Sequence, residues 1–170
     1  LAGDIAVSYD ADGLVTSVGD PTQAQITTYA YDHLNRRISM TLPDPDGTGP
    51  QAAPVTHYTY DGFGNLATQT DANGKVTYFK YDPLGRLLVT IRKQNDTADL
   101  IDADDAVTSY AYDPNGNRLS VATRINATAY LTNYFGDDAL NHQVAAINGA
   151  GDTTLTSYDS VGNVLTVIAP

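Results

Sequence analysis

Bulky hydrophobic side chains recur at alternate positions in short runs along this chain, and segments rich in Asp, Gly and Asn separate the runs. Side chains two residues apart lie on one face of a β-strand, so each run predicts a strand with an apolar face. The pairs are Val7/Tyr9, Tyr29/Tyr31, Tyr58/Tyr60, Phe79/Tyr81 and Tyr110/Tyr112. The runs are also rich in Thr, which favours strands. No window has a convincing helical period, so we expect an all-β protein.

A second apolar pair follows most runs and predicts a return strand. These pairs are Ile38/Met40, Leu119/Val121, Val144/Ala146 and Leu165/Val167. In two copies the apolar residue, Leu66 or Leu87, stands one position earlier relative to the preceding Tyr. Because a shift of one residue moves a side chain to the other face, this pattern predicts a strand register that differs between copies.

A recurring motif connects each strand to its return strand: Tyr, Asp, two variable residues, then Gly or Asn. The copies are Tyr9, Asp10, Gly13; Tyr31, Asp32, Asn35; Tyr60, Asp61, Gly64; Tyr81, Asp82, Gly85; Tyr112, Asp113, Gly116; Asp138, Asn141 (with Asp137 in place of Tyr); and Tyr158, Asp159, Gly162. Gly and Asn tolerate a left-handed backbone best, so we expect positive φ at the last position. The Asp side chain is expected to close the turn by accepting backbone amides two residues on.

Repetition of this strand–turn–strand unit predicts a long antiparallel β-meander or ribbon of about seven repeats. We expect residues 1–170 to form a single array, with insertion loops near 43–54 and 93–106. The segment Thr97 to Ala106 is the best place for a short helix or an ordered loop. The first residue is Leu1, which suggests a processed product or a piece of a longer protein.

Charge and composition narrow the function. All 20 acidic residues are Asp, and the net charge is −11. Nucleic acid and anionic membrane surfaces demand Lys and Arg, so neither is an expected partner. No apolar run approaches the length of a membrane helix, so membrane insertion is not expected. The absence of Cys and the composition rich in Asp, Thr, Asn, Gly and Tyr are typical of secreted bacterial repeat proteins, so we expect an extracellular or cell-surface location.

The phrases Tyr81–Leu87 and Tyr112–Leu119 resemble YD repeats, also called RHS repeats, and the resemblance extends from Tyr9 to Val167. It implies a β-ribbon that belongs to a spiralling open sheet or shell, as in bacterial polymorphic toxins, the cocoon components of insecticidal toxin complexes, and teneurins. In the toxins such a shell encloses a C-terminal toxin domain. A closed shell needs more than seven repeats, and the self-cleaving end of the RHS core is not recognisable here.

Turn and sheet chemistry offers an ordinary explanation for each candidate site. The motif Tyr residues stack in ladders on neighbouring strands or form an aromatic surface for sugars or an unfolded cargo; we favour the ladders. The carboxylates of Asp102, Asp104 and Asp105 are the best candidates for Ca²⁺, although solvated turn acids are the favoured interpretation. We expect no catalytic residue, no enzyme activity and no obligatory cofactor or metal.

The leading hypothesis is a structural module that forms part of a β-shell or scaffold of a secreted bacterial protein and encapsulates or displays a toxin. The alternative is a self-assembling extracellular fibre or adhesin subunit, joined through exposed strand edges near residues 5–9 and 164–168. A third hypothesis is a carbohydrate-binding module that uses rows of Tyr. The expected partners are further repeats of a parent chain or copies of this chain, with an enclosed toxin or a glycan as additional candidates.

Overall fold

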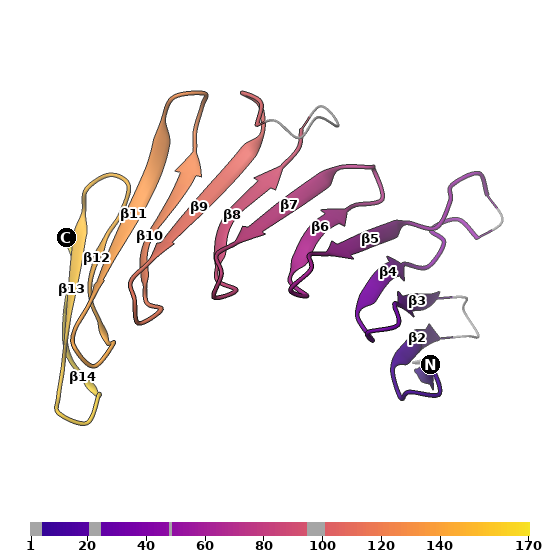
Figure 1. The fold of residues 1–170 in the computed structure, drawn as a ribbon, viewed down its shortest axis with the longest axis horizontal. Helices are drawn as coiled ribbons and strands as arrows, with labels where there is room; N and C mark the ends of the chain where they lie inside the picture. Colours follow the sequence, from indigo (N-terminus) through magenta and orange to yellow (C-terminus); the bar gives the residue numbers. More distant parts are fainter. Residues whose placement is uncertain (1–4, 21–24, 48, 95–100) are drawn as a thin grey trace. The chain divides into compact units, whose positions relative to one another are not determined.

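The computed structural model describes residues 5–20, 25–47, 49–94 and 101–170. These residues form fourteen strands and no helix, and the strands make one antiparallel sheet in which the strand order follows the chain order (Figure 1). The prediction of an all-β antiparallel meander is therefore confirmed. The described residues include no helix of the length and apolarity that a membrane span requires.

The chain divides into two compact units. The first unit, Leu1–Thr77, holds six strands and the start of a seventh. They are β1 (Ala6–Tyr9), β2 (Val15–Asp20), β3 (Gln25–Tyr31), β4 (Arg37–Thr41), β5 (Val55–Tyr60), β6 (Leu66–Thr70) and the beginning of β7 (Val76–Tyr81). Within this unit each strand from β1 to β6 pairs antiparallel with the next one.

The second unit, Tyr78–Pro170, holds the remainder of β7 and seven further strands. They are β8 (Leu87–Arg92), β9 (Ala106–Tyr112), β10 (Arg118–Arg124), β11 (Tyr130–Asp137), β12 (Gln143–Ile147), β13 (Thr153–Tyr158) and β14 (Val164–Ile168). Consecutive strands from β8 to β14 again pair antiparallel. In each unit, every hairpin of the meander has its motif turn at one rim of the sheet and its link to the next hairpin at the other rim.

The hairpin of Leu66 has the same strand register as the other hairpins whose pairing is known, and the prediction of a shifted register at Leu66 is wrong. Tyr60 pairs with Leu66, six residues on, just as Tyr31 pairs with Arg37 and Tyr158 pairs with Val164. One residue further along, these return strands carry a β-bulge; Ala67 is the extra residue in the Leu66 copy. The motif turn has a fixed length and therefore sets the register, while the bulge absorbs the displaced apolar residue.

Burial is slight because each unit is a single layer of strands. In the described part of the chain, the buried side chains are Ile91, Val107, Lys93 and Asp105. Ile91 and Val107 face each other across β8 and β9, and the Lys93–Asp105 pair closes the link between these two strands. The helix considered at Thr97 to Ala106 does not form over residues 101–105, and residues 95–100 of that segment lie outside the described residues.

Candidate functional site

The seven motif turns share one backbone geometry. Every Gly or Asn at the last motif position has positive φ, from 61° at Asn35 to 97° at Gly116, as predicted. In each turn the amide of this residue donates to the carbonyl of the motif Asp, and the amide of the Asp donates to the carbonyl four residues on. This is a three-residue hairpin loop in which a left-handed residue forms a bulge. The geometry explains why only Gly and Asn occur at this position.

The motif Asp carboxylate replaces a hydrogen bond that the bulge removes. In the turn at Asp61, Oδ1 accepts the amide of Phe63 and the amide of Asn65, each at 2.9 Å. The second amide has no backbone partner because Gly64 has taken the carbonyl that it would otherwise use. A buried or half-buried amide without an acceptor is costly, so an acceptor must stand here. The prediction that the Asp side chain closes the turn is confirmed.

A further functional position follows directly after the Gly or Asn, and sequence reasoning missed it. We call its occupants the clamp residues: Leu14, Arg36, Asn65, Arg86, Asn117, His142 and Asn163. In all turns except that of Leu14, the clamp side chain contacts Oδ2 of the motif Asp, as Arg36 Nε does at 2.8 Å and Asn163 Nδ2 does at 2.8 Å. The shared signal is an N–H donor five residues after the Tyr position, although the residue types differ.

These hydrogen bonds keep the motif carboxylates ionised. The side-chain hydrogen bond from Arg36, with backbone amides adding to it, lowers the pKa of Asp32 to about 2 against the opposing effect of desolvation. The side chain of Asn65 likewise lowers the pKa of Asp61, and that of Asn163 lowers the pKa of Asp159. At Asp113, desolvation acts to raise the pKa, but the bonds from Asn117 outweigh it and the pKa falls. Each carboxylate is thus committed to its own turn.

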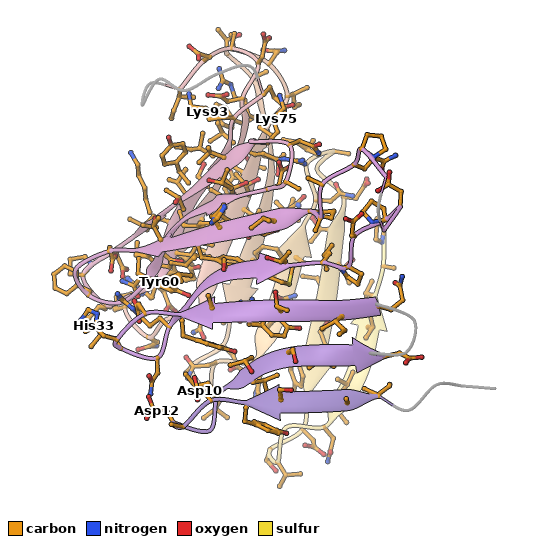
Figure 2. The ribbon with its side chains drawn as sticks, turned by 90° about the vertical axis from the view of Figure 1, so that its right-hand side faces the viewer. Asp10, Asp12, His33, Tyr60, Lys75 and Lys93 are labelled. Carbon is orange, nitrogen blue, oxygen red and sulfur yellow. The ribbon has the colours of Figure 1, made fainter. Side chains whose placement is uncertain are left out.

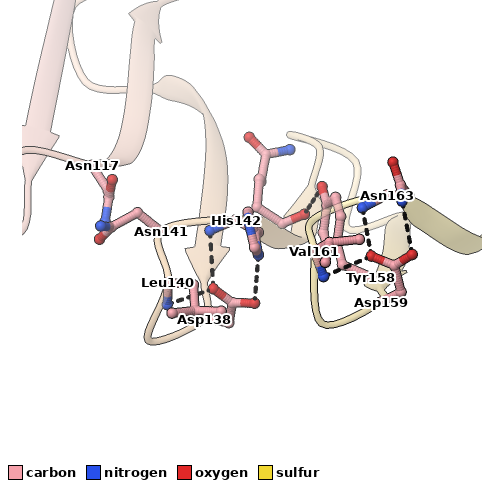
Figure 3. A network of polar contacts seen from close by, with 10 residues as sticks. Asn117, Asp138, Leu140, Asn141, His142, Tyr158, Asp159, Val161 and Asn163 are labelled. Atoms are coloured by element: carbon pink, nitrogen blue, oxygen red, sulfur yellow. Dashed lines mark hydrogen bonds and ion pairs between the residues drawn. The ribbon is translucent and has the colours of Figure 1, made fainter.

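In three repeats the hydroxyl of the motif Tyr connects the hairpin to the repeat before it. The hydroxyl of Tyr31 donates to the carbonyl of Val15 at 2.8 Å, that of Tyr60 to Arg37 at 2.8 Å, and that of Tyr158 to Gln143 at 2.9 Å. In these three bonds the acceptor is the residue after the clamp residue of the preceding repeat. We call this contact the cross-repeat bond; Figure 3 shows it between Tyr158 and the preceding hairpin, beside the turns of Asp138 and Asp159.

The clamp residue also covers the ring of the next Tyr. The guanidinium of Arg36 lies 4.5 Å from the centre of the Tyr60 ring, and the ring of His142 stacks on Tyr158 with centroids 4.8 Å apart. At these repeats a cation or an imidazole of the preceding repeat contacts one face of the Tyr ring, so the ring takes part in the contact between neighbouring hairpins. A residue that binds its own Asp and the next Tyr therefore couples local turn structure to the neighbouring hairpin.

The tips of the turns carry exposed apolar side chains, which turn chemistry does not require. The third residue after the Tyr position is Leu34, Phe63, Leu84, Leu140 or Val161 in five of the seven copies, and all five are exposed, with Phe63 at 94%. Sequence reasoning treated this position as variable and missed its apolar character. The signal was present as a recurring Leu, Phe or Val in an otherwise polar loop.

Two links between repeats contain the same kind of turn without a motif Tyr. Asp71 accepts the amides of Asn73 and Lys75 at 2.9 Å, and Asn148 accepts those of Ala150 and Asp152 at 2.9 Å. Both links are thus closed by an Asp or Asn side chain in the same way as the motif turns. In the second link Asn148 donates to Asp152 Oδ2, so the amide and the carboxylate have exchanged positions relative to the motif turns.

Two of the three Ca²⁺ candidates contact an ammonium group. Lys93 Nζ contacts Asp105 Oδ2 at 2.9 Å and Asp102 Oδ2 at 3.7 Å, and the amide of Asp102 also donates to Asp105 Oδ2 at 2.8 Å. Desolvation acts to raise the pKa of Asp105, but the bond from Lys93 and the backbone amides outweigh it and lower the pKa. Within the described ranges, no group of three or more His or Asp side chains is arranged to hold a metal ion.

An open groove of about 550 Å³ separates the first two motif turns of the first unit. Asp10, Asp12, Asp32, His33 and Asn35 contribute to its lining, and Figure 2 shows Asp10, Asp12 and His33 at this rim. Asp10 and Asp32 already accept the amides of their own turns. The groove therefore follows from two adjacent copies of the turn and offers no separate catalytic arrangement.

Comparisons with known proteins agree with this repeated geometry. The RHS Repeat family model matches residues 9–48, 50–76 and 60–98, which together cover more than half of the chain. No curated protein matches the sequence.

Among solved structures, the chain is similar to the crystal structure of TcdB2-TccC3 without its hypervariable C-terminal region, with 19% identity and a TM-score of 0.74 over 98% of this chain and 9% of that chain. It is also similar to the crystal structure of TcdB2-TccC3, with 15% identity and a TM-score of 0.53 over 96% of this chain and 10% of that chain. A Tc holotoxin pore of Photorhabdus luminescens matches at 15% identity over 99% of this chain and 14% of that chain, but its TM-score is 0.31 and supports no argument. The chain thus spans about a tenth of the first two chains, with which it shares its fold. Through its family match and its repeated turns, this chain belongs to the RHS repeat family.

Proposed function

We propose that this chain is a wall segment of an RHS-repeat shell in a secreted bacterial toxin complex, where it helps to enclose or display a toxin. The supporting observation is a single-layered sheet that aligns over 98% of its length with 9% of a much longer chain. A sheet with so few buried side chains gains stability from neighbouring repeats more than from a core of its own. Its mechanism is containment: the strands supply the wall and the links between repeats supply variable surface.

The state of the carboxylates supports a non-catalytic role. A general acid needs a raised pKa and a free oxygen, whereas the clamp residues and turn amides lower the pKa of six motif Asp residues and occupy both of their oxygens. The same hydrogen bonds argue against a resident metal at the motif. The net charge of −11 supports the absence of nucleic acid among the partners.

One alternative is supported by a specific observation. The strand β14 exposes Val164, Leu165, Val167 and Ile168, as an extracellular fibre subunit with adhesive edges would. The carbohydrate-binding hypothesis has less support, because four half-buried motif Tyr residues contact the preceding repeat through their hydroxyls or ring faces: Tyr31, Tyr60, Tyr112 and Tyr158.

The denatured intact mass of the protein isolated from its native source tests the proposal. A mass many times larger than 18.1 kDa is expected, because a shell needs many more repeats. Limited proteolysis of that parent should then leave the RHS region intact and protect a cargo domain until the shell is denatured. A mass near 18.1 kDa would contradict the shell and favour the fibre.

A further inference from the structure

The sixth repeat departs from the motif at two positions. Asp137 stands in place of Tyr, so this repeat has no hydroxyl for the cross-repeat bond and no ring for the preceding clamp residue to cover. The motif also ends in Asn141, where most copies have Gly. Gly and Asn both tolerate a positive φ such as the 64° of Asn141, so the turn alone does not explain the Asn side chain.

The side chain of Asn141 reaches the preceding hairpin. Its Oδ1 accepts a hydrogen bond from Nδ2 of Asn117, the clamp residue of the fifth repeat, at 2.7 Å, and Figure 3 shows the two side chains beside each other. Asn115 Nδ2 lies 3.4 Å from the same oxygen. Asn117 Nδ2 also donates to Asp113 Oδ2 at 3.0 Å, so it bonds within its own turn and to the next hairpin. Because an ionised carboxylate only accepts, this second bond fixes the orientation of the Asn117 amide and makes Asn141 the acceptor.

The other Asn at the last motif position provides a comparison within the chain. The clamp residue that precedes Asn35 is Leu14, whose side chain has no N–H to donate. The side chain of Asn35 makes no hydrogen bond within the part of the chain that the structure describes. In that repeat the Tyr is present, and the hydroxyl of Tyr31 makes the cross-repeat bond to Val15. The Asn amide is therefore engaged where the Tyr is missing and idle where the Tyr is present.

We propose that the Asn117–Asn141 amide pair replaces the missing Tyr and is the side-chain contact by which the sixth hairpin recognises the fifth. Hairpins of one repeat type offer nearly the same backbone ladder to any neighbour, so backbone pairing alone distinguishes them poorly. The amide pair forms when an Asn clamp residue meets an Asn at the last motif position, whereas a Leu clamp residue would leave Asn141 without its donor. The pair concerns the order of hairpins within this chain and goes beyond the role of the chain in a shell wall.

One substitution at two positions tests the pair. Asn141→Gly keeps the left-handed turn and removes the bond to Asn117, whereas Asn35→Gly makes the same change at an idle side chain. Asn141→Gly should melt about 2–4 °C below Asn35→Gly, as expected for one lost hydrogen bond in a chain of this size. Native-state hydrogen exchange should place the loss of protection at β10 and β11 in Asn141→Gly, with no such loss in Asn35→Gly.

A double-mutant cycle separates the pair from other effects of Asn141. Asn117→Leu places the side chain of the first clamp residue in the fifth repeat and removes the donor. In the Asn117→Leu background, Asn141→Gly should cause no further fall in melting temperature, because the bond is already gone.

A rescue tests whether the pair stands in for the Tyr. Added to Asn141→Gly, Asp137→Tyr supplies a ring and a hydroxyl that can donate to the carbonyl of Arg118, the residue after the clamp residue Asn117. It should recover most of the lost melting temperature, and Asp137→Phe, which supplies the ring alone, should recover less. Far-UV circular dichroism of each variant establishes that the strands are retained.

Equal melting temperatures for Asn141→Gly and Asn35→Gly overturn the inference. An effect of Asn141→Gly that persists undiminished beside Asn117→Leu also overturns it, because Asn141 then acts through another group. If Asn117→Leu does not fold, the comparison of the two Gly variants and the Asp137→Tyr rescue decide the question. A loss that is confined to β10 and β11, vanishes without Asn117 and is recovered by Asp137→Tyr is the result that supports the pair.

Discussion

The two rims of the sheet are built by different rules within each unit. The motif rim repeats one turn of constant length in which the Asp side chain, the Gly or Asn and the clamp residue satisfy one another. The link rim is irregular: the link after Thr41 runs to Val55, whereas the link after Thr70 reaches Val76 directly through the turn at Asp71. The difference shows that register is fixed at the motif rim, so length at the link rim is free to vary.

One link is held by a buried ion pair, and removal of this pair should have the largest effect. Lys93 and Asp105 are both buried and hold the ends of the link between β8 and β9 together at 2.9 Å. Lys93→Met leaves a buried carboxylate without its cation and should destabilise the second unit by about 3 kcal/mol. Chemical denaturation followed by circular dichroism measures the change. The double variant Lys93→Met with Asp105→Asn should recover much of the loss, and an equal loss in both would argue against charge pairing as the cause.

Insertions test the comparison between the rims directly. Four Gly/Ser residues placed between Phe63 and Gly64 separate Gly64 from Asp61 and break the two backbone bonds that close the turn, which should cost about 2 kcal/mol. The same insertion between Gln51 and Ala52 lengthens an already irregular link and should cost less than about 1 kcal/mol. Denaturant midpoints of the two variants give the difference. Equal costs would show that the link constrains register as much as the turn does.

The sequence predicted the motif rim well because its chemistry is local. Tyr, Asp and Gly lie within five residues of one another, and their turn geometry depends on no distant partner. The clamp position escaped notice because Arg, Asn and His look unrelated until their shared N–H is seen against Asp Oδ2. The apolar spacing predicted the wrong register at Leu66, because the register is set by the constant length of the turn. Lys93 and Asp105 lie at opposite ends of a link, and their contact depends on how β8 and β9 pair. The sequence around Asp105 therefore indicated only a cluster of acidic residues.

Substitution by Ala should have different effects on stability at the two Gly positions of one turn, Gly62 and Gly64. Gly64 has a φ of 90° and open space around it, so Gly64→Ala meets no steric clash but strains the backbone, which should cost about 1 kcal/mol. Gly62 lies in the same turn with equally open space and no positive φ, so Gly62→Ala should be nearly neutral. Thermal melts compare the two. Gly64→Asn provides a rescue, since Asn35 and Asn141 hold the same conformation; a neutral Gly64→Ala would refute the strain argument.

The smallest effect per residue is the dependence of the motif rim on pH. Folding lowers the pKa of Asp32 to about 2, so below about pH 4 the unfolded chain binds a proton that the folded chain does not, and stability falls as the pH drops from about 4 toward 2. Above about pH 4 this contribution is fully present. Five further motif carboxylates with lowered pKa act in the same direction. We therefore expect the melting temperature to fall steeply over this window.

The variant Arg36→Leu isolates the clamp residue, since Leu14 occupies the same position in the first repeat. It removes the main cause of the lowered pKa of Asp32, so it should be less stable than the wild type near neutral pH and approach it as the pH falls toward 2. Lys80→Leu, which removes one positive charge from an exposed strand position, controls for net charge. A difference in melting temperature between Arg36→Leu and wild type that stays constant across the window would mean that Arg36 acts by covering the Tyr60 ring, 4.5 Å away, and not through the Asp32 carboxylate.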